Sequence, residues 1–312
     1  MSLSFAPDPE WGHSSGALPA TDVCDVGVDK HDNVYLFARD ALPVRVFTRE
    51  GAFLSGWGEG EFVRPHGLAM GRDGASLFLT DEGSHSVRKY GLDGKLLLEI
   101  AAPQGGAPFM SGAPFNRCTH SCETSNGDIH VSDGYGNARI HRFSRGGAFI
   151  ASWGESGSGP GQFNLPHNIT VDDYDRLYIA DRENHRIQIF ASDGAYLDQW
   201  NNLHRPCALT CAADGTFYIG ELGPALALNR HYPNLGCAVK VLNNVGALTA
   251  RFGDEHPGVA TTQFLAPHGV AVDSHGDVYI AEVSHAIWPT LFPDKEAPAD
   301  LPSLRKWKRI AA

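Results

Sequence analysis

A repeated strand–turn–strand pattern runs along the chain and constrains its fold more than any other feature. Six segments each contain an apolar strand, a turn rich in Asp, Asn or Gly, and a second apolar strand that in most segments ends beside an acidic residue. Repeats of this kind indicate that one supersecondary unit is copied along the chain. The second strands are predicted at residues 34–39, 77–82, 129–134, 177–182, 217–222 and 278–283.

Each unit continues with two further strands. Third strands such as ARIHRF and HRIQIF follow, and fourth strands such as AFIASWG and AFLSGWG end in Trp-Gly. Four short strands in each of six units predict an all-β fold, a six-bladed β-propeller. The 35 glycines and 19 prolines suit such a turn-rich β protein.

The two ends of the chain are predicted to complete one blade together. The final segment SLRKWKRI provides a third strand, and the N-terminal PDPEWG ends in the Trp-Gly of a fourth strand. We expect this N-terminal strand to close the propeller, because closure removes an exposed sheet edge. Residues 1–312 are therefore expected to form a single domain.

The charge and the cysteines restrict the partners and the location. A formal net charge of −11 argues against nucleic acid or an anionic membrane surface as a partner. No stretch is apolar enough for a transmembrane helix, and MSLSFAPDPEWG lacks the basic and apolar regions of a secretory signal. The six cysteines lack zinc-ribbon spacing, and we expect reduced thiols in a cytoplasmic protein.

Three Pro-His pairs recur at the start of first strands, at intervals of 101 residues: VRPHGLAM, NLPHNITV and LAPHGVAV. Aligning the repeats by their turns places Asp25, His66, Thr119, His167, Cys207 and His268 at one position. First strands line the axis of a propeller, so histidines on alternate blades should converge with near three-fold geometry. Three neutral imidazoles with an open position are typical of catalytic zinc. The alternative is that each histidine is bonded locally.

Two arginines and a tyrosine are expected around this metal site. First and second strands run antiparallel, so second-strand ends lie on the same face as the histidines. Arg39, Arg182 and Tyr135 stand at or just after such ends. Arginine binds carboxylates through a bidentate fork, and a tyrosine near a dication can act as a base.

Two insertions between second and third strands are predicted to form the walls of a substrate pocket. They cover about residues 223–236 and 286–301, and binding residues often lie on such loops. The candidate contacts are His231, Tyr232, Trp288 and Phe292, together with His85 after the second strand of blade 2.

The segments VSDGYGNARI, LPHNITV, ADRENHRIQIF, SWGESGSGPGQF and APHGVAV resemble the peptidyl-α-hydroxyglycine α-amidating lyases, NHL-repeat six-bladed propellers. The resemblance runs from about residue 20 to the end and is strongest over 129–190. It implies cleavage of a carbinolamide C–N bond to an amide and glyoxylate, with a carboxylate-bearing small molecule or peptide as substrate. It implies zinc on the three histidines, Tyr135 as the base, and carboxylate and charge handling by Arg39 and Arg182.

The sequence departs from this family in three respects. The family's structural calcium would use carbonyls matching Val26 and Leu68, but its Asp ligand corresponds to Gly269, which argues against calcium. The position of a pocket methionine is Ala266, and we expect no monooxygenase half that would supply hydroxylated peptides. A different α-hydroxy acid such as ureidoglycolate is therefore an alternative substrate.

Two other classes of propeller remain open at this point. Lactonase-type propellers hold calcium with oxygen ligands, which three histidines do not supply. A non-catalytic NHL binding platform would not need histidine on alternate blades, and an RNA-binding version would need a basic face. The fold alone does not choose among these functions, whereas the histidines favour the zinc-dependent lyase.

Overall fold

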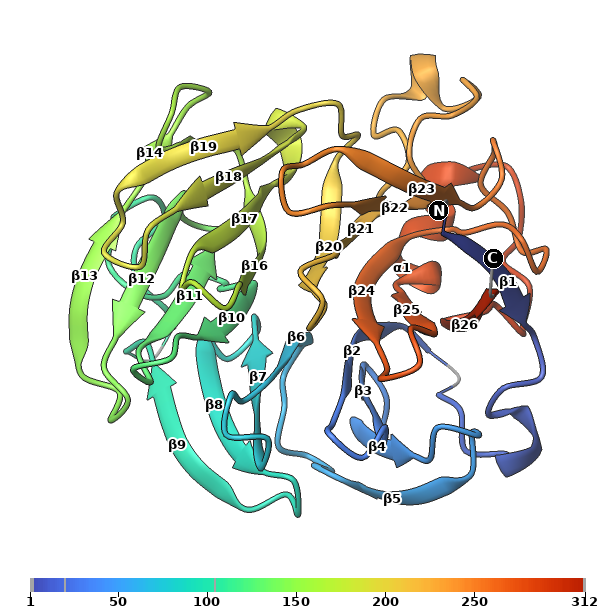
Figure 1. Cartoon of the computed structure of the whole chain (residues 1–312), viewed down its shortest axis with the longest axis horizontal. Coiled ribbons are helices and arrows are strands. Elements are labelled where there is room, and N and C mark those ends of the chain that lie inside the picture. The colour runs from blue at the N-terminus through green and yellow to red at the C-terminus, as the bar shows by residue number, and fades with distance from the viewer. Residues whose placement is uncertain (1–2, 20, 104, 311–312) are drawn as a thin grey trace. The chain divides into compact units, whose positions relative to one another are not determined.

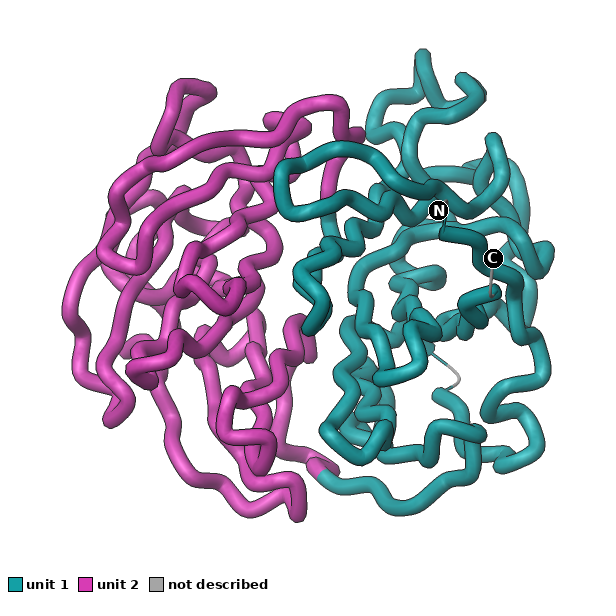
Figure 2. The backbone as a smooth tube through the Cα atoms, viewed as in Figure 1, with its two compact units in different colours: residues 1–57, 207–312 teal, residues 58–206 magenta. Residues whose placement is uncertain are grey.

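The computed structural model describes residues 3–19, 21–103 and 105–310 and consists mostly of β-strands. The chain divides into two compact units (Figure 2). Unit 1 comprises residues 1–57 and 207–312, and unit 2 comprises residues 58–206. The prediction of one domain over residues 1–312 stays a prediction.

Unit 2 contains three four-stranded antiparallel sheets, which are blades 2, 3 and 4. A two-stranded parallel pair, β14 (Glu155–Ser156) and β15 (Gln162–Phe163), precedes blade 4. The strands of the three blades, in order, are β6 (Pro65–Met70), β7 (Ser76–Asp81), β8 (Ser86–Gly91) and β9 (Leu96–Ala101), then β10 (His120–Glu123), β11 (Ile129–Asp133), β12 (Arg139–Phe143) and β13 (Phe149–Trp153), then β16 (Pro166–Val171), β17 (Leu177–Asp181), β18 (Arg186–Phe190) and β19 (Tyr196–Trp200).

Unit 1 contains the other three four-stranded sheets, which are blades 1, 5 and 6. The exception is Pro206, the first residue of blade 5, which belongs to unit 2. With six such sheets, the predicted six-bladed β-propeller is confirmed. The strands are β2 (Val23–Val28), β3 (Val34–Ala38), β4 (Val44–Phe47) and β5 (Phe53–Trp57), then β20 (Pro206–Cys211), β21 (Phe217–Glu221), β22 (Ala238–Leu242) and β23 (Leu248–Phe252), then β24 (Pro267–Val272), β25 (Val278–Glu282), β26 (Leu304–Ile310) and β1 (Ser4–Asp8).

Aspartates fix the turns between first and second strands. In blade 4, Asp172 Oδ1 accepts the backbone N–H groups of Tyr174 and Arg176, each at 2.9 Å. Asp29 and Asp273 make the same pair of bonds in blades 1 and 6. A short carboxylate that bonds its own backbone two residues on favours a tight turn over continued strand. The predicted turn positions therefore have a local cause.

The core lies between neighbouring blades of each unit. Second strands such as β11, β17 and β25 are buried at every residue because sheets pack on both of their faces. In unit 2, Phe163, Ile169 and Phe190 belong to one such cluster. In unit 1, Ile280 and Trp307 belong to another. Burial of this apolar surface holds neighbouring blades of the same unit together.

The blade shared by the chain ends closes as predicted, but its outer strand lies earlier than expected. β1 pairs with β26 in register from Ser4↔Ile310 to Asp8↔Lys306 (Figure 1). The prediction used PDPEWG, residues 7–12, as the strand, and only Pro7 and Asp8 belong to it. Pro9 has no N–H to continue the pairing. Trp11 lies beyond the strand and packs on Phe47 and Tyr279.

The predicted insertion at 286–301 is partly helical. Helix α1 (Ser284–Leu291) begins after β25 and is the longest helix among the described residues. Short 3-10 turns occur at His13–Ser15, Arg182–Asn184 and Ala227–Asn229. Within the described part of the chain, no helix has the length and hydropathy needed to cross a membrane.

Arg49 holds blade 1 to blade 6 within unit 1. Its Nε donates to Asp273 Oδ2 at 2.8 Å, and its Nη2 donates to Asp277 Oδ2 at 2.6 Å. The side chain of Asp273 is fully buried. Trp11 Nε1 and Lys306 Nζ donate to the Arg49 carbonyl. A buried carboxylate that loses its partner is strongly destabilising, so this contact should be important for stability.

We expect Arg49→Met to lower the free energy of unfolding by about 2–3 kcal/mol, less than for a fully buried pair because Arg49 is one quarter exposed. Chemical denaturation at neutral pH measures the change. Glu50→Gln, an exposed charge next to Arg49 in the chain, is the control and should stay within about 0.5 kcal/mol of wild type. Equal stability of both variants would show that the contact does not hold the blades.

Candidate metal centre and its arginines

A β-bulge at the start of the first strand positions each candidate metal ligand. In blade 2, Pro65 pairs with Asp81 and Gly67 pairs with Thr80, so His66 lies between two paired residues without an opposite partner. His167 and His268 lie at the same kind of bulge in blades 4 and 6. A bulge turns one side chain away from the alternation of its strand. All three histidines are buried.

The register corrects the alignment of blade 1. Val23 pairs with Ala38 and Asp25 pairs with Phe37, so the bulge residue is Cys24 and not Asp25. Asp25 therefore corresponds to Gly67 of blade 2. The alignment of blade 1 was one residue out, because Cys24 precedes the turn residue Asp29 by five positions, just as His167 precedes Asp172 and His268 precedes Asp273. The correction leaves histidine at this position in blades 2, 4 and 6 alone among the described first strands.

Backbone carbonyls orient the imidazoles. His66 Nδ1 donates to the Thr119 carbonyl at 2.7 Å in unit 2. His268 Nδ1 donates to the Cys24 carbonyl at 2.6 Å in unit 1. A carbonyl only accepts, so each bond fixes the tautomer with the proton on Nδ1 and the lone pair on Nε2. This is the form in which histidine binds a metal ion.

The hydroxyl of Tyr135 lies between two of these imidazoles. Its oxygen is 3.1 Å from His66 Nε2 and 3.2 Å from His167 Nε2. The centroids of the two imidazoles are 4.9 Å apart. A phenol has one proton and can donate to only one of the two nitrogens. Both Nε2 atoms thus point to the same small region, as a shared cation requires.

Two arginines flank the ring of Tyr135. The guanidinium carbon of Arg117 lies 4.8 Å from the ring centroid, and that of Arg182 lies 5.8 Å from it. Both are within the range of cation–π attraction. Arg182 was predicted at this site from the sequence, whereas Arg117 was missed.

A signal for these arginines exists in the sequence. An arginine stands two residues before the bulge position in blades 2, 3 and 5, as Arg64, Arg117 and Arg205. The pattern is hard to see because Pro follows Arg64 and Arg205 but Cys follows Arg117. The predicted Arg182 instead follows a second strand and begins a 3-10 turn.

Two glutamates each hold two of the arginines. Glu82 accepts from Arg64 Nε and, at 2.9 Å, from Arg117 Nη2. Glu183 accepts from Arg182 Nε and Arg205 Nη2, both at 2.8 Å. We call these sets the Glu82 bracket and the Glu183 bracket. Together they contain four guanidiniums and two carboxylates, and one arginine of each bracket, Arg117 or Arg182, lies over the Tyr135 ring.

The charge state of Glu183 is well defined. Burial raises its pKa, but the hydrogen bond from Arg205 and the charges of Arg182 and Arg205 outweigh burial and lower it to about 2. The pKa is below its unfolded value, so the carboxylate stabilises the fold above pH 4.5, and this contribution disappears as the pH falls towards 2. Both arginines of the Glu183 bracket therefore have a charged partner at neutral pH.

Arg39, the other predicted carboxylate-binding residue, lies in unit 1. Its Nη1 donates to Asp22 Oδ2 at 3.2 Å, and its side chain is mostly buried. Asp22 Oδ1 accepts the backbone N–H groups of His285 and Ala286 at the start of α1. This network fixes Asp22 and, through it, the guanidinium of Arg39.

The structure gives His85 a structural contact. His85 has a positive φ of 53°, and its Nδ1 accepts the backbone N–H of Arg117 at 2.9 Å. His185 repeats this arrangement, with a φ of 57° and a 3.2 Å bond from the N–H of Arg205. Because the contact recurs in two blades, it belongs to the repeat and positions the arginines of the brackets.

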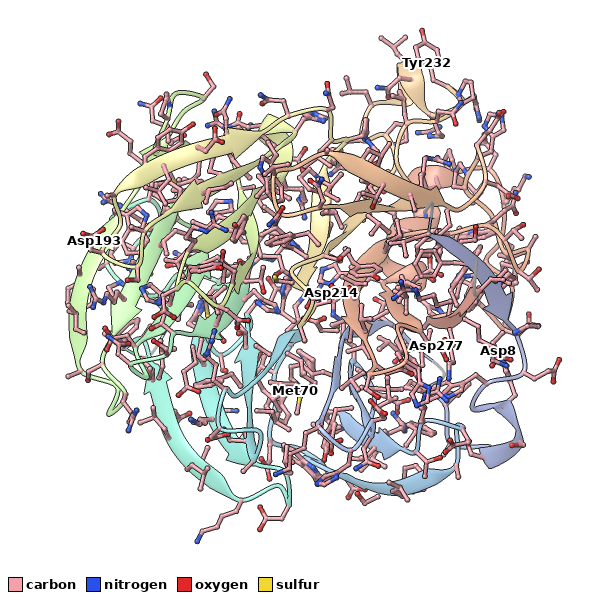
Figure 3. All side chains as sticks on the ribbon, in the orientation of Figure 1. Asp8, Met70, Asp193, Asp214, Tyr232 and Asp277 are labelled. Atoms are coloured by element: carbon pink, nitrogen blue, oxygen red, sulfur yellow. The ribbon has the colours of Figure 1, made fainter. Side chains whose placement is uncertain are left out.

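The predicted contacts on the insertions differ in exposure. Trp288 is buried, stacks on Phe292 with centroids 4.5 Å apart, and donates to the Lys295 carbonyl at 3.0 Å. It packs in a small cluster of unit 1, and its role as a substrate contact stays a prediction. His231 and the exposed Tyr232 lie on the segment between β21 and β22, at the edge of unit 1 (Figure 3).

One of the two carbonyls predicted for calcium, that of Leu68, lies beside a histidine. His120 Nε2 lies 3.2 Å from the Leu68 carbonyl, and its Nδ1 lies 3.1 Å from the Ile169 carbonyl. In unit 1, Asp25 Oδ1 accepts the N–H of Val26 at 2.9 Å. A side chain on Gly269 would collide with the Asp25 carboxylate. A neutral imidazole has one N–H, so His120 can donate to only one of the Leu68 and Ile169 carbonyls.

The cysteines fit the prediction of core thiols as far as burial tests it. Five of the six are buried, and Cys211 is intermediate. Burial raises the pKa of the Cys118 and Cys122 thiols well above the ordinary value. Such thiols are poor nucleophiles and poor metal ligands at neutral pH.

His66, His167 and His268 each offer an imidazole nitrogen with which the chain could hold a metal ion.

Comparison with known proteins agrees with this description of the fold. The NHL repeat model matches residues 163–190. Over the whole chain, the Streptogramin B lyase structure superimposes with a TM-score of 0.63 at 14% identity, covering 99% of each chain. That likeness shows the fold alone.

Two relatives match in sequence. Peptidyl-alpha-hydroxyglycine alpha-amidating lyase 1 of Drosophila melanogaster is 35% identical over 73% of the chain, which spans 44% of that protein. NHL repeat-containing protein 3 of Homo sapiens is 32% identical over 90% of the chain, which spans 82% of that protein. The chain therefore belongs to the NHL-repeat propeller family that includes NHL repeat-containing protein 3, and it is related to the peptidyl-α-hydroxyglycine α-amidating lyases.

Proposed function

We propose that the chain is a zinc-dependent carbon–nitrogen lyase that cleaves an α-hydroxyglycine-type carbinolamide to an amide and glyoxylate. The observation that carries the proposal is the Tyr135 hydroxyl, which lies within 3.2 Å of Nε2 of both His66 and His167. A base beside metal-binding imidazoles suits removal of a proton from an α-hydroxyl. The relationship to the Drosophila lyase supports the same reaction.

The residues present fit a zinc ion. The tautomer of His66 directs its Nε2 lone pair to the region shared with His167, and neutral imidazole is a favoured zinc ligand. His268 has the same tautomer and the same bulge, and it is the proposed third ligand. A bound zinc ion would supply Lewis-acid polarisation of a substrate oxygen.

Tyr135 is the proposed general base. It takes the proton of the substrate α-hydroxyl, and the electrons of that O–H bond form the carbonyl of glyoxylate. The C–N bond breaks, its electron pair stays on nitrogen, and the nitrogen takes up a proton to give the amide. Arg117 and Arg182, on the faces of the Tyr135 ring, favour the phenolate because positive charge stabilises it.

The arginines also orient the substrate in this proposal. Arg39 is held by Asp22 and Arg182 by Glu183, so both guanidiniums are fixed before the substrate arrives. A fixed fork binds a carboxylate with little loss of conformational entropy. We assign binding of the substrate α-carboxylate to Arg39 and stabilisation of developing negative charge to Arg182.

The metal proposal predicts that His167→Ala lowers the zinc content of the purified protein from about one ion per chain to well below half. Two imidazoles hold a divalent ion less well than three. Elemental analysis after dialysis measures the content. His185→Ala, which removes an imidazole at a turn of the same blade, is the matched control and should keep its zinc. A wild type that is fully active without metal would rule out the proposed site.

The base proposal predicts that Tyr135→Phe lowers kcat by roughly 10²–10⁴ and leaves the zinc content unchanged. The variant keeps the ring that contacts Arg117 and removes only the hydroxyl. Glyoxylate release from an α-hydroxyglycine derivative measures kcat. Tyr174→Phe, at an exposed tyrosine, should behave as wild type. Wild-type kcat in Tyr135→Phe, or loss of its zinc, would assign Tyr135 a structural role instead.

A further inference from the structure

The Glu82 bracket differs from the Glu183 bracket in its exposure to solvent. Arg64 and Arg117 are 50% and 49% exposed, whereas the side chain of Glu82 is 2% exposed. In the Glu183 bracket, Arg182 and Arg205 are each only 11% exposed. The Glu82 bracket thus presents two guanidiniums to solvent and keeps its carboxylate behind them.

The need to neutralise the buried Glu82 carboxylate accounts for only one of the two arginines that contact it. A buried carboxylate needs one opposite charge, and the second guanidinium leaves the bracket with a positive charge. Arg64 donates to Glu82 from Nε and Arg117 from Nη2, and each guanidinium has five N–H groups. N–H donors of two guanidiniums therefore remain for an anionic ligand at a half-exposed position, while the buried Asp81 beside Glu82 accepts from the Arg64 backbone.

The backbone fixes the position of both arginines beside the reaction centre. The N–H of Arg64 donates to Asp81 Oδ1 at 2.8 Å, and the N–H of Arg117 donates to His85 Nδ1 at 2.9 Å. Arg64 precedes His66 by two residues, and Arg117 lies over the Tyr135 ring. Guanidiniums held in this way are preorganised for a ligand that also reaches Tyr135.

We propose that Arg64 and Arg117 bind a second carboxylate, on the acyl part of the substrate, in addition to its α-carboxylate. The two arginines already share one planar carboxylate, that of Glu82, so their spacing suits another. The inference rests on the proposed function and narrows its substrate class to α-hydroxyglycine derivatives with an acidic acyl group. Arg64 and Arg117 are then specificity-determining residues.

Binding of unreactive analogues tests the inference independently of turnover. N-succinylglycine carries the second carboxylate, N-butyrylglycine has an acyl chain of the same length without it, and neither has the α-hydroxyl. Isothermal titration calorimetry with zinc-loaded wild type should give a Kd for N-succinylglycine about tenfold lower, equivalent to about 1.4 kcal/mol. Arg117→Gln, and separately Arg64→Gln, should reduce this ratio to about two or less.

Arg145→Gln is the matched control. Arg145 is an exposed arginine of unit 2 that donates to the Asn126 carbonyl, and its loss should leave the tenfold ratio intact. Equal binding of the two analogues by wild type, or no binding of either, would overturn the inference. So would a wild-type ratio in both bracket variants. Two bracket variants are used so that misfolding of one, detected by circular dichroism, still leaves a test.

Turnover of the hydroxylated pair separates this inference from the proposed function. N-succinyl-α-hydroxyglycine should show a higher kcat/KM than N-butyryl-α-hydroxyglycine, and Arg117→Gln should lower the first more than the second. If neither compound releases glyoxylate but the binding ratio and its loss are observed, the proposed function fails and the carboxylate site stands. If both release glyoxylate at equal kcat/KM and bind equally, the proposed function stands and the carboxylate site fails.

Discussion

The chemistry of the candidate site depends on the hydrogen bond from a histidine Nδ1 to a backbone carbonyl. In His66 this bond is made to the carbonyl of Thr119, the residue immediately before β10. It fixes the tautomer, and the bulge at His66 fixes the direction of the ring. Without both, Nε2 would not present a lone pair beside the Tyr135 hydroxyl, and neither a metal site nor a base would follow. The repeat supplies the same two features at His268.

The electrostatics of the site arise locally and oppose the charge of the whole protein. The chain is acidic overall, yet the two brackets concentrate positive charge around Tyr135. Each bracket uses a glutamate to hold two guanidiniums in place, which limits the entropy lost when a ligand binds. The same charge would favour a phenolate at Tyr135 and an anionic substrate. Base and substrate binding thus have a common physical cause in this account.

The fold could be predicted from the sequence because each repeat contains the same turn residues and the same apolar strands. Aspartate turns and apolar second strands predicted nearly every strand, and Pro-His pairs identified the candidate ligands. Features that depend on register or on tertiary packing were not predicted. The alignment by turns assigned Asp25 to the blade 1 position, whereas the strand register places Cys24 there. Trp288 packs in a cluster formed with residues distant in sequence, and Arg117 reaches Tyr135 only through the fold.

We propose that this NHL-repeat propeller breaks a carbon–nitrogen bond. The most direct measurement is product analysis after zinc-loaded protein is incubated with N-benzoyl-α-hydroxyglycine, with glyoxylate and benzamide quantified by liquid chromatography. The account predicts equal amounts of the two products, formed well above the rate of spontaneous breakdown. Formation at the spontaneous rate by protein that carries one zinc ion per chain would contradict it.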